Sequence, residues 1–153
     1  MATQWLSPDE QRAWRAYVES TKVLFDALDR QLQHEADMPH AYYQVLVRLS
    51  EAPERSLRMS ELADKTLSSR SRLSHAVARL EERGWVTRSN CETDRRGQVA
   101  TLTDAGYSVL VDAAPGHVAA VRRFVVDALS ADQLTALAEI GETIVQRVGT
   151  STD

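Results

Sequence analysis

Residues 60–106 constrain the fold of this 153-residue chain more than any other segment. Their apolar and turn-forming residues predict a short helix, a turn, a longer helix over 68–83, and two strands around a polar loop. Gly84 follows the longer helix at the position where many helices end in a left-handed residue. This order of elements is that of a helix-turn-helix followed by a hairpin wing.

The predicted longer helix separates an apolar stripe from a polar face. Ser68 and Ser69 offer hydroxyl groups that can cap its first turn. The stripe recurs at helical spacing and consists of Leu73, Ala76, Val77 and Leu80. The polar face carries cations and small donors along its first three turns, whereas the acids Glu81 and Glu82 come only in the last turn.

That distribution of charge indicates a helix whose N-terminal half lies in the major groove of DNA. Serine and arginine can donate to phosphates or base edges, whereas carboxylates would be repelled there. The alternative is an ordinary amphipathic surface helix. The candidate DNA contacts are Ser68, Ser69, Arg70, Ser71, Arg72, Ser74, His75 and Arg79.

The loop between the two predicted strands is basic and rich in turn-forming residues. We place the wing at 88–98, between β-favouring runs at 85–87 and 99–102. Arginines at such a tip suit a narrow minor groove, where the negative potential is strongest. The candidate contacts here are Arg88, Asp94, Arg95 and Arg96. We expect Asp94 to pair with Arg96 or Arg88 and so to hold the wing in shape.

Three motifs in this segment resemble those of the MarR (multiple antibiotic resistance regulator) family of winged-helix transcription factors. They are Ser-Glu-Leu-Ala at 60–63, Arg-Leu-Glu-Glu-Arg-Gly at 79–84, and the run from Asp-Arg-Arg-Gly at 94–97 to Leu-Thr-Asp-Ala-Gly at 102–106. The last contains the family's wing signature. The resemblance implies a mainly helical α+β winged helix-turn-helix that binds double-stranded DNA at specific sequences and regulates transcription, expected to be a repressor.

Apolar helical stripes also lie outside the winged segment. We predict one helix over 7–36, which begins at Ser7, and two helices within 103–149, which begin at Thr103 and Ser130. The first of these two has a break or kink at Pro115 and Gly116. A winged lobe over 39–102 does not need this extra apolar surface for its own core. The resemblance assigns these flanks to dimerisation.

We therefore expect one domain over 1–153 that forms a homodimer. A twofold dimer would present two recognition helices roughly 34 Å apart, which matches a pseudo-palindromic operator. The alternative is a monomer whose terminal helices pack only on its own winged lobe.

Charge is distributed unevenly along the chain, whose net charge is −4. Residues 56–100 hold nine Lys and Arg against six Asp and Glu, which gives +3 and leaves −7 on the remainder. A basic segment on an acidic body can still bind phosphate. Without an apolar run that could span a membrane, and without a signal-peptide pattern, we expect a cytoplasmic protein that associates with the nucleoid when bound to DNA.

No pattern in the chain indicates an enzyme, a cofactor or a metal site. The four histidines are scattered, and no glycine-rich phosphate loop or nucleophile elbow occurs. The segment 34–40 could in principle hold a divalent cation, although a polar helix end is the simpler interpretation.

The resemblance further implies a pocket for a small aromatic or phenolic effector between the dimerisation helices and the winged core. The candidate lining residues are Trp14, Arg15, Tyr17, Tyr42 and Tyr43. The alternative is that these aromatics are core residues and that the protein binds DNA without a ligand. A second alternative is a redox-responsive regulator through Cys91, the single cysteine, whose thiol could equally be inert.

Overall fold

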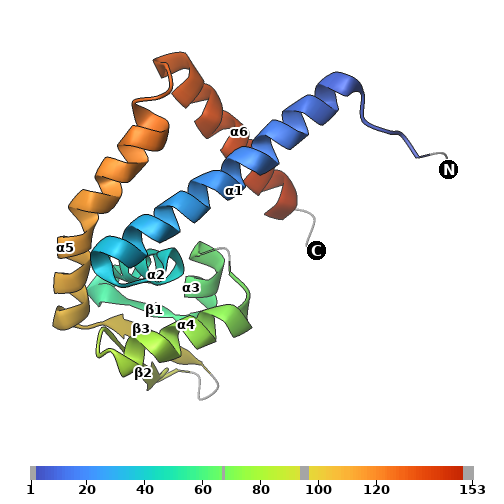
Figure 1. Ribbon diagram of the computed structural model, residues 1–153. Helices are drawn as coiled ribbons and strands as arrows, with labels where there is room; N and C mark the ends of the chain where they lie inside the picture. The colour runs from blue at the N-terminus through green and yellow to red at the C-terminus, as the bar shows by residue number, and fades with distance from the viewer. Residues whose placement is uncertain (1–2, 67, 94–96, 150–153) are drawn as a thin grey trace. The chain divides into compact units, whose positions relative to one another are not determined.

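Helices make up most of the chain in the computed structural model, which describes residues 3–66, 68–93 and 97–149 (Figure 1). One compact unit spans Met1–His117 and a second spans Val118–Asp153. The elements, in chain order, are α1 (Pro8–Ala36), α2 (His40–Ser50), η1 (Pro53–Arg55), β1 (Ser56–Arg58), α3 (Met59–Lys65), α4 (Arg70–Glu82), β2 (Val86–Asn90), β3 (Gln98–Leu102), α5 (Asp104–Val121), η2 (Arg122–Val126) and α6 (Ala131–Gly149).

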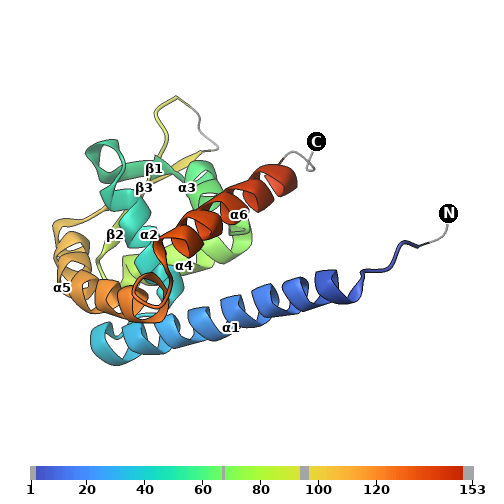
Figure 2. The same cartoon turned by 90° about the horizontal axis from the view of Figure 1, so that it is seen from above.

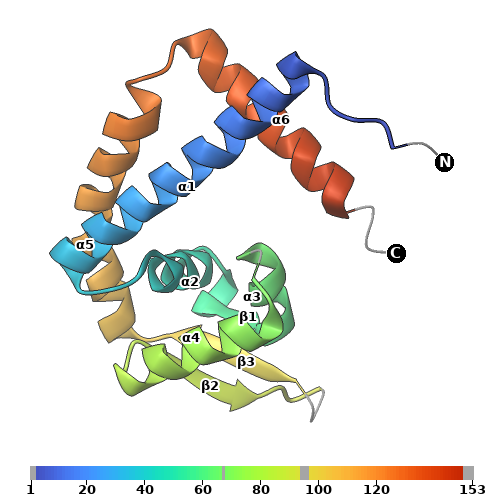
Figure 3. The ribbon, with the colours of Figure 1, turned by 45° about the vertical axis from the view of Figure 1, so that its right-hand side comes forward.

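The mainly helical winged helix-turn-helix fold that the sequence predicts is confirmed. The first unit carries the helix-turn-helix as α3 and α4, and the wing as β2 and β3. Figure 3 shows α2, α3 and α4 packed beside the small sheet. None of the helices that the structure describes is both long and apolar enough to cross a membrane.

The sheet has three antiparallel strands in the order β1-β3-β2, whereas the sequence predicted two strands. The strand that was missed, β1, pairs Leu57 with Ala100 in β3. Ser56 and Thr101 face each other across this pair, with their hydroxyl oxygens 2.7 Å apart. A three-residue strand is too short to show alternation in the sequence, so only its partner defines it.

The winged core closes around the apolar stripe of α4. Leu73 is 2% exposed, and Val77 and Leu80 are fully buried, as the helical spacing predicted. They pack in one cluster with Leu46 from α2 and Leu62 from α3, among others. Burial of this stripe fixes which face of α4 remains in solvent.

Serine hydroxyls cap α1 and α4. Ser7 and Glu10 form a capping box at α1, in which the backbone N–H of Ser7 donates to Glu10 over 2.7 Å. At α4 the cap is Ser69, whose Oγ accepts from the backbone N–H of Arg72 at 3.2 Å. The recognition helix therefore begins at Arg70 rather than at Ser68.

Gly84 ends α4 in a Schellman turn. Its φ of +74° lies in the left-handed region, where glycine avoids the strain of a side chain. Its N–H donates to the carbonyl of Glu81 at 2.9 Å, and the N–H of Trp85 donates to the carbonyl of Leu80 at 3.0 Å. The chain thus passes from α4 into β2 through one rigid turn.

The start of α5 is fixed to this same turn. Thr103 caps α5 by accepting from the N–H of Gly106, and its hydroxyl donates to the carbonyl of Gly84 at 2.7 Å. A Cβ at Gly106 would lie 2.2 Å from the backbone oxygen of Trp85. Only glycine fits this approach.

Of the break or kink predicted at Pro115 and Gly116, a break does not occur, since α5 continues through Pro115 to Val121. A Cβ at Gly116 would lie 2.3 Å from the Glu35 carboxylate of α1, and the neighbouring His117 side chain is buried. The departure from α-helical geometry comes later, at η2.

The N-terminal half of α1 lies outside the core of the first unit. Every residue from 3 to 20 is exposed, and Figure 2 shows this half of the helix extending away from the winged elements. Trp14 is 58% exposed.

Replacement of Gly106 by alanine tests the close approach between α5 and the turn. We expect Gly106→Ala to destabilise the protein by about 1–3 kcal/mol, because the new methyl group must displace backbone. Gly149→Ala is the control, since a Cβ there meets nothing within 4 Å, and it should change the unfolding free energy by less than about 0.5 kcal/mol. Equal stability of the two variants in urea denaturation would refute the packing assigned to Gly106.

Candidate nucleic-acid interface

The solvent face of α4 carries the side chains that the sequence assigned to DNA. Arg72, His75 and Arg79 are exposed, and Ser68 before the helix is half-buried. The remaining candidates at this helix are also exposed, namely Ser69, Arg70, Ser71 and Ser74. The predicted face is therefore accessible along its whole length.

The two acids of α4 are both engaged by arginines. Glu82 pairs with Arg79 one turn earlier, with 2.9 Å between Oε2 and Nη1, and both side chains are more than half exposed. This hydrogen bond, with the charge of Glu82, raises the pKa of Arg79 above its ordinary value. Glu81 is turned toward the wing.

Glu81 and Arg88 form a half-buried contact between α4 and β2. The Arg88 Nε donates to Glu81 Oε2 at 2.8 Å, and its Nη2 lies 2.7 Å from the same oxygen. The other carboxylate oxygen accepts from the Arg88 backbone N–H at 3.1 Å. Arg88 Nη1 also reaches Ser74 Oγ at 3.5 Å. One carboxylate thus fixes both the backbone and the side chain at the base of the wing.

The sequence analysis did not predict this contact. It predicted that Arg88 would contact DNA or pair with Asp94. Seven residues separate Glu81 from Arg88, and a left-handed glycine between them reverses the chain. A glutamate three residues before such a glycine and an arginine four residues after it is the signal that could have revealed the pair.

The tip of the wing is only partly described. The Cys91 N–H donates to the Gly97 carbonyl at 2.8 Å and extends the β2–β3 hairpin. Asp94, Arg95 and Arg96 lie outside the described residues, so their assigned contacts, including the pairing of Asp94 with Arg96, stay predictions.

Cys91 lies within a short chain of polar contacts near the tip. It is half-buried, and its Sγ lies 3.3 Å from Thr93 Oγ1. Thr93 Oγ1 in turn accepts from Arg58 Nη2 at 2.9 Å. Arg58 comes from β1, the strand that the sequence analysis did not predict.

The five residues predicted to line an effector pocket do not gather in one place within the chain. Trp14 and Arg15 border a shallow cavity on the exposed part of α1, and the ring of Tyr17 lies 6.2 Å from that of Trp14. Tyr42 lies near Arg83, whose guanidinium carbon is 5.8 Å from the ring centre. Tyr43 is buried and lies 4.3 Å from the His117 ring.

Tyr43 borders a separate cavity of about 280 Å³ in the first unit. Its lining includes His40, His117, Arg48 and Lys65. Burial lowers the pKa of His40 and of His117, and the charge of His40 lowers the pKa of His117 further. Within the described part of the chain, no group of three or more His, Cys, Asp or Glu side chains could hold a metal ion.

The neighbouring acids Glu81 and Glu82 provide a matched pair of variants. Glu81→Gln should lower the free energy of unfolding by about 1–2 kcal/mol, because it weakens charged hydrogen bonds in a half-buried contact. Glu82→Gln removes an exposed, solvent-screened pair and should change the free energy of unfolding less than Glu81→Gln does. Denaturant unfolding of both variants measures the difference. If Glu82→Gln lowered the free energy of unfolding as much as Glu81→Gln, the contact between Glu81 and Arg88 would have no special role in stability.

Comparison with known proteins gives one consistent family. The model of the MarR family matches residues 36–97, which include the helix-turn-helix and the first wing strand, β2. The transcriptional repressor MprA of Escherichia coli is 32% identical over 73 residues, which are 48% of this chain and 42% of the repressor. The chain therefore aligns with less than half the length of that relative.

Solved structures extend the similarity over nearly the whole chain. Sco3205, a MarR family transcriptional regulator from Streptomyces coelicolor solved in complex with DNA, is 54% identical, with a TM-score of 0.91 over 94% of this chain and 91% of that one. AbsC, another MarR family regulator from Streptomyces coelicolor, is 40% identical, with a TM-score of 0.90 over 97% of this chain and 99% of that one. With its winged fold and its exposed basic helix face, the protein belongs to the MarR family of transcriptional regulators.

Proposed function

We propose that this protein binds double-stranded DNA as a homodimer and represses transcription at a pseudo-palindromic operator. In this proposal α4 enters the major groove and the wing, residues 88–98, enters the adjacent minor groove. A regulator of this kind acts where the chromosome lies, which we take to be the cytoplasm.

The observation that carries the proposal is the charge of the α4 surface. Its exposed face presents arginines, serines and a histidine, while both of its carboxylates are held by arginines of the same lobe. A groove lined by phosphates can therefore approach α4 without meeting an unpaired acid. Sco3205 supports this proposal, because it was solved with DNA and is 54% identical to this chain.

Exposed apolar surface on the terminal helices supports the homodimer. No residue of α6 is buried within the chain, and Ile140, Val145 and Val148 are each more than half exposed. Phe25 on α1 is 48% exposed. Apolar surface of this kind is typical of protein interfaces. A twofold pairing through these helices would double the DNA-binding surface and match a palindromic site.

A small aromatic or phenolic effector forms the second part of the proposal. The cavity beside Tyr43 combines an aromatic wall with Arg48 and Lys65, which suits a small aromatic anion better than the exposed surface around Trp14. A regulator that needs no ligand, or one that responds through oxidation of Cys91, is the alternative. Thermal-shift screening with phenolic acids and with peroxide, followed by gel shifts, separates these outcomes.

Selection of duplexes from a random library by the purified protein tests DNA binding directly. We expect an enriched inverted repeat with half-sites about one helical turn apart. Enrichment of single half-sites, or no enrichment above that by an unrelated acidic protein, would contradict the proposal.

Arg72 should read bases from the early part of α4. Arg72→Ala should cost about 1–3 kcal/mol on the selected operator and relax preference at one base position. Arg30→Ala, which removes the same charge from α1 outside the proposed DNA surface, is the control. Fluorescence anisotropy against single-base operator variants measures both, and an unchanged preference for Arg72→Ala would contradict this assignment.

Single substitutions in α6 of the full chain test the dimer. Ile140→Glu should yield a species near the 17.1 kDa mass of one chain, because a carboxylate cannot be buried in an apolar interface without a partner. Gln146→Glu adds the same charge on the polar side of α6, one turn after Glu142, and should leave the dimer intact. Light scattering gives the masses and circular dichroism checks folding. A wild-type protein of single-chain mass at micromolar concentration would refute the dimer.

A further inference from the structure

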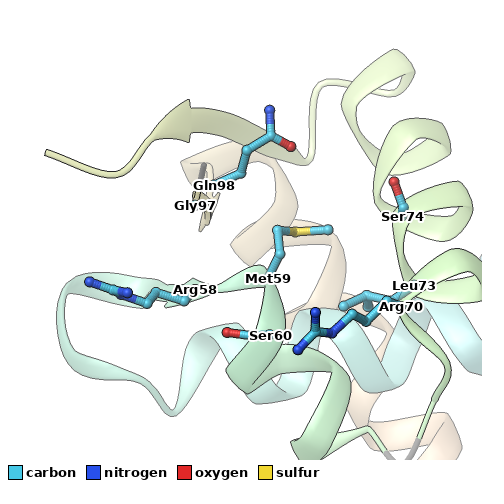
Figure 4. A pocket seen from close by; sticks show the side chains of 8 residues that line it. All are labelled: Arg58, Met59, Ser60, Arg70, Leu73, Ser74, Gly97 and Gln98. Atoms are coloured by element: carbon cyan, nitrogen blue, oxygen red, sulfur yellow. The ribbon is translucent and has the colours of Figure 1, made fainter. Parts of the chain in front are cut away.

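A cavity of about 450 Å³ lies between the helix-turn-helix and the wing (Figure 4). The strand β1, the helices α3 and α4, and the wing strand β3 with the residue before it all contribute to its walls. The lining residues are Arg58, Met59, Ser60, Arg70, Leu73, Ser74, Gly97 and Gln98.

The lining combines an apolar floor with hydrogen-bond donors. Met59 and Leu73 supply the apolar part. Around them stand two guanidinium groups, two hydroxyls and one amide, and none of the described residues that line the cavity is acidic. Figure 4 shows Arg58 and Arg70 on opposite sides of Ser60. Two guanidinium groups without a carboxylate suit a ligand that carries phosphate.

Duplex geometry identifies that ligand. The major and minor grooves are separated by a single sugar-phosphate strand. If α4 lies in the major groove and the wing in the neighbouring minor groove, the strand between the grooves must cross the space between α4 and the wing. That space is this cavity.

We propose that the cavity seats this DNA backbone strand, with Arg58 and Arg70 binding its phosphates from two sides. Ser60, Ser74 and Gln98 offer further donors. This inference rests on the proposed DNA binding, and it adds Arg58, Ser60 and Gln98 to the contacts that the sequence indicated.

Arg58 is placed for this role by contacts on both sides. Its backbone belongs to β1, where it pairs with Val99 of β3, and its N–H donates to Glu61 at 3.3 Å. Its Nη2 donates to Thr93 Oγ1 in the wing at 2.9 Å. A guanidinium has five N–H donors, so this bond leaves others for phosphate. A phosphate bound here would be linked to the wing through Arg58.

The salt dependence of binding tests the proposal. The probes are a duplex that the protein selects from a random library and a duplex of unrelated sequence, each titrated between about 50 and 200 mM salt. Arg58→Gln should weaken binding to both duplexes alike and reduce the slope of log affinity against log salt by about one unit. Arg58→Lys should retain the wild-type slope.

Two controls separate phosphate binding from support of the wing. Thr93→Val removes the bond to Arg58 but keeps the charge, so its slope should equal that of the wild type. Arg30→Gln removes an exposed arginine of α1, outside the surface proposed for DNA, and its slope should also be unchanged. Circular dichroism confirms that each variant is folded.

An unchanged slope for Arg58→Gln would overturn the proposal, whether or not its affinity falls. If Thr93→Val and Arg58→Gln lost the same affinity and both kept the wild-type slope, the role of Arg58 would be to support the wing and not to bind phosphate. Loss of binding to the selected duplex alone would make Arg58 a base-reading residue instead. If the wild-type protein bound neither duplex, the proposed function itself would fall, and with it this assignment.

Discussion

The orientation of the wing relative to α4 depends on one turn and one ion pair. Gly84 reverses the chain in a left-handed conformation, and Glu81 then holds both the backbone and the guanidinium of Arg88 at the base of β2. Thr103 ties the start of α5 to the same turn. The major and minor grooves of a duplex lie at fixed positions relative to each other. A protein that enters both grooves therefore needs α4 and the wing held in a fixed relative orientation.

The same contacts settle how an acidic chain can present a basic surface. Each carboxylate of α4 is paired with an arginine, so the outward face of the helix keeps its cations and hydroxyls while its acids are neutralised. Placement of the charges thus matters more than their sum, which is −4. The remaining negative charge lies mostly on the flanking helices, where it would oppose unspecific adhesion to nucleic acid.

Local signals predicted most of the fold, whereas contacts distant in sequence were missed. Ser7, Ser69, Thr103 and Gly84 act within one helical turn of their own positions, so their roles could be inferred from spacing. The strand β1 exists only through its pairing with β3, more than forty residues away. For the same reason Arg58 was not recognised as a neighbour of the wing. At Pro115, a local rule predicted a break or kink, whereas α5 continues through this proline beside Glu35 of α1.

Methylation interference on the selected operator tests the central claim most directly, since it reports both grooves in one experiment. Methyl groups on guanine N7 mark the major groove and those on adenine N3 mark the minor groove. Our account predicts N7 interference in two half-sites about one turn apart, with N3 interference at the minor groove adjoining each half-site. Interference confined to one groove, or without twofold symmetry, would contradict a dimer that reads the major groove with α4 and the minor groove with the wing.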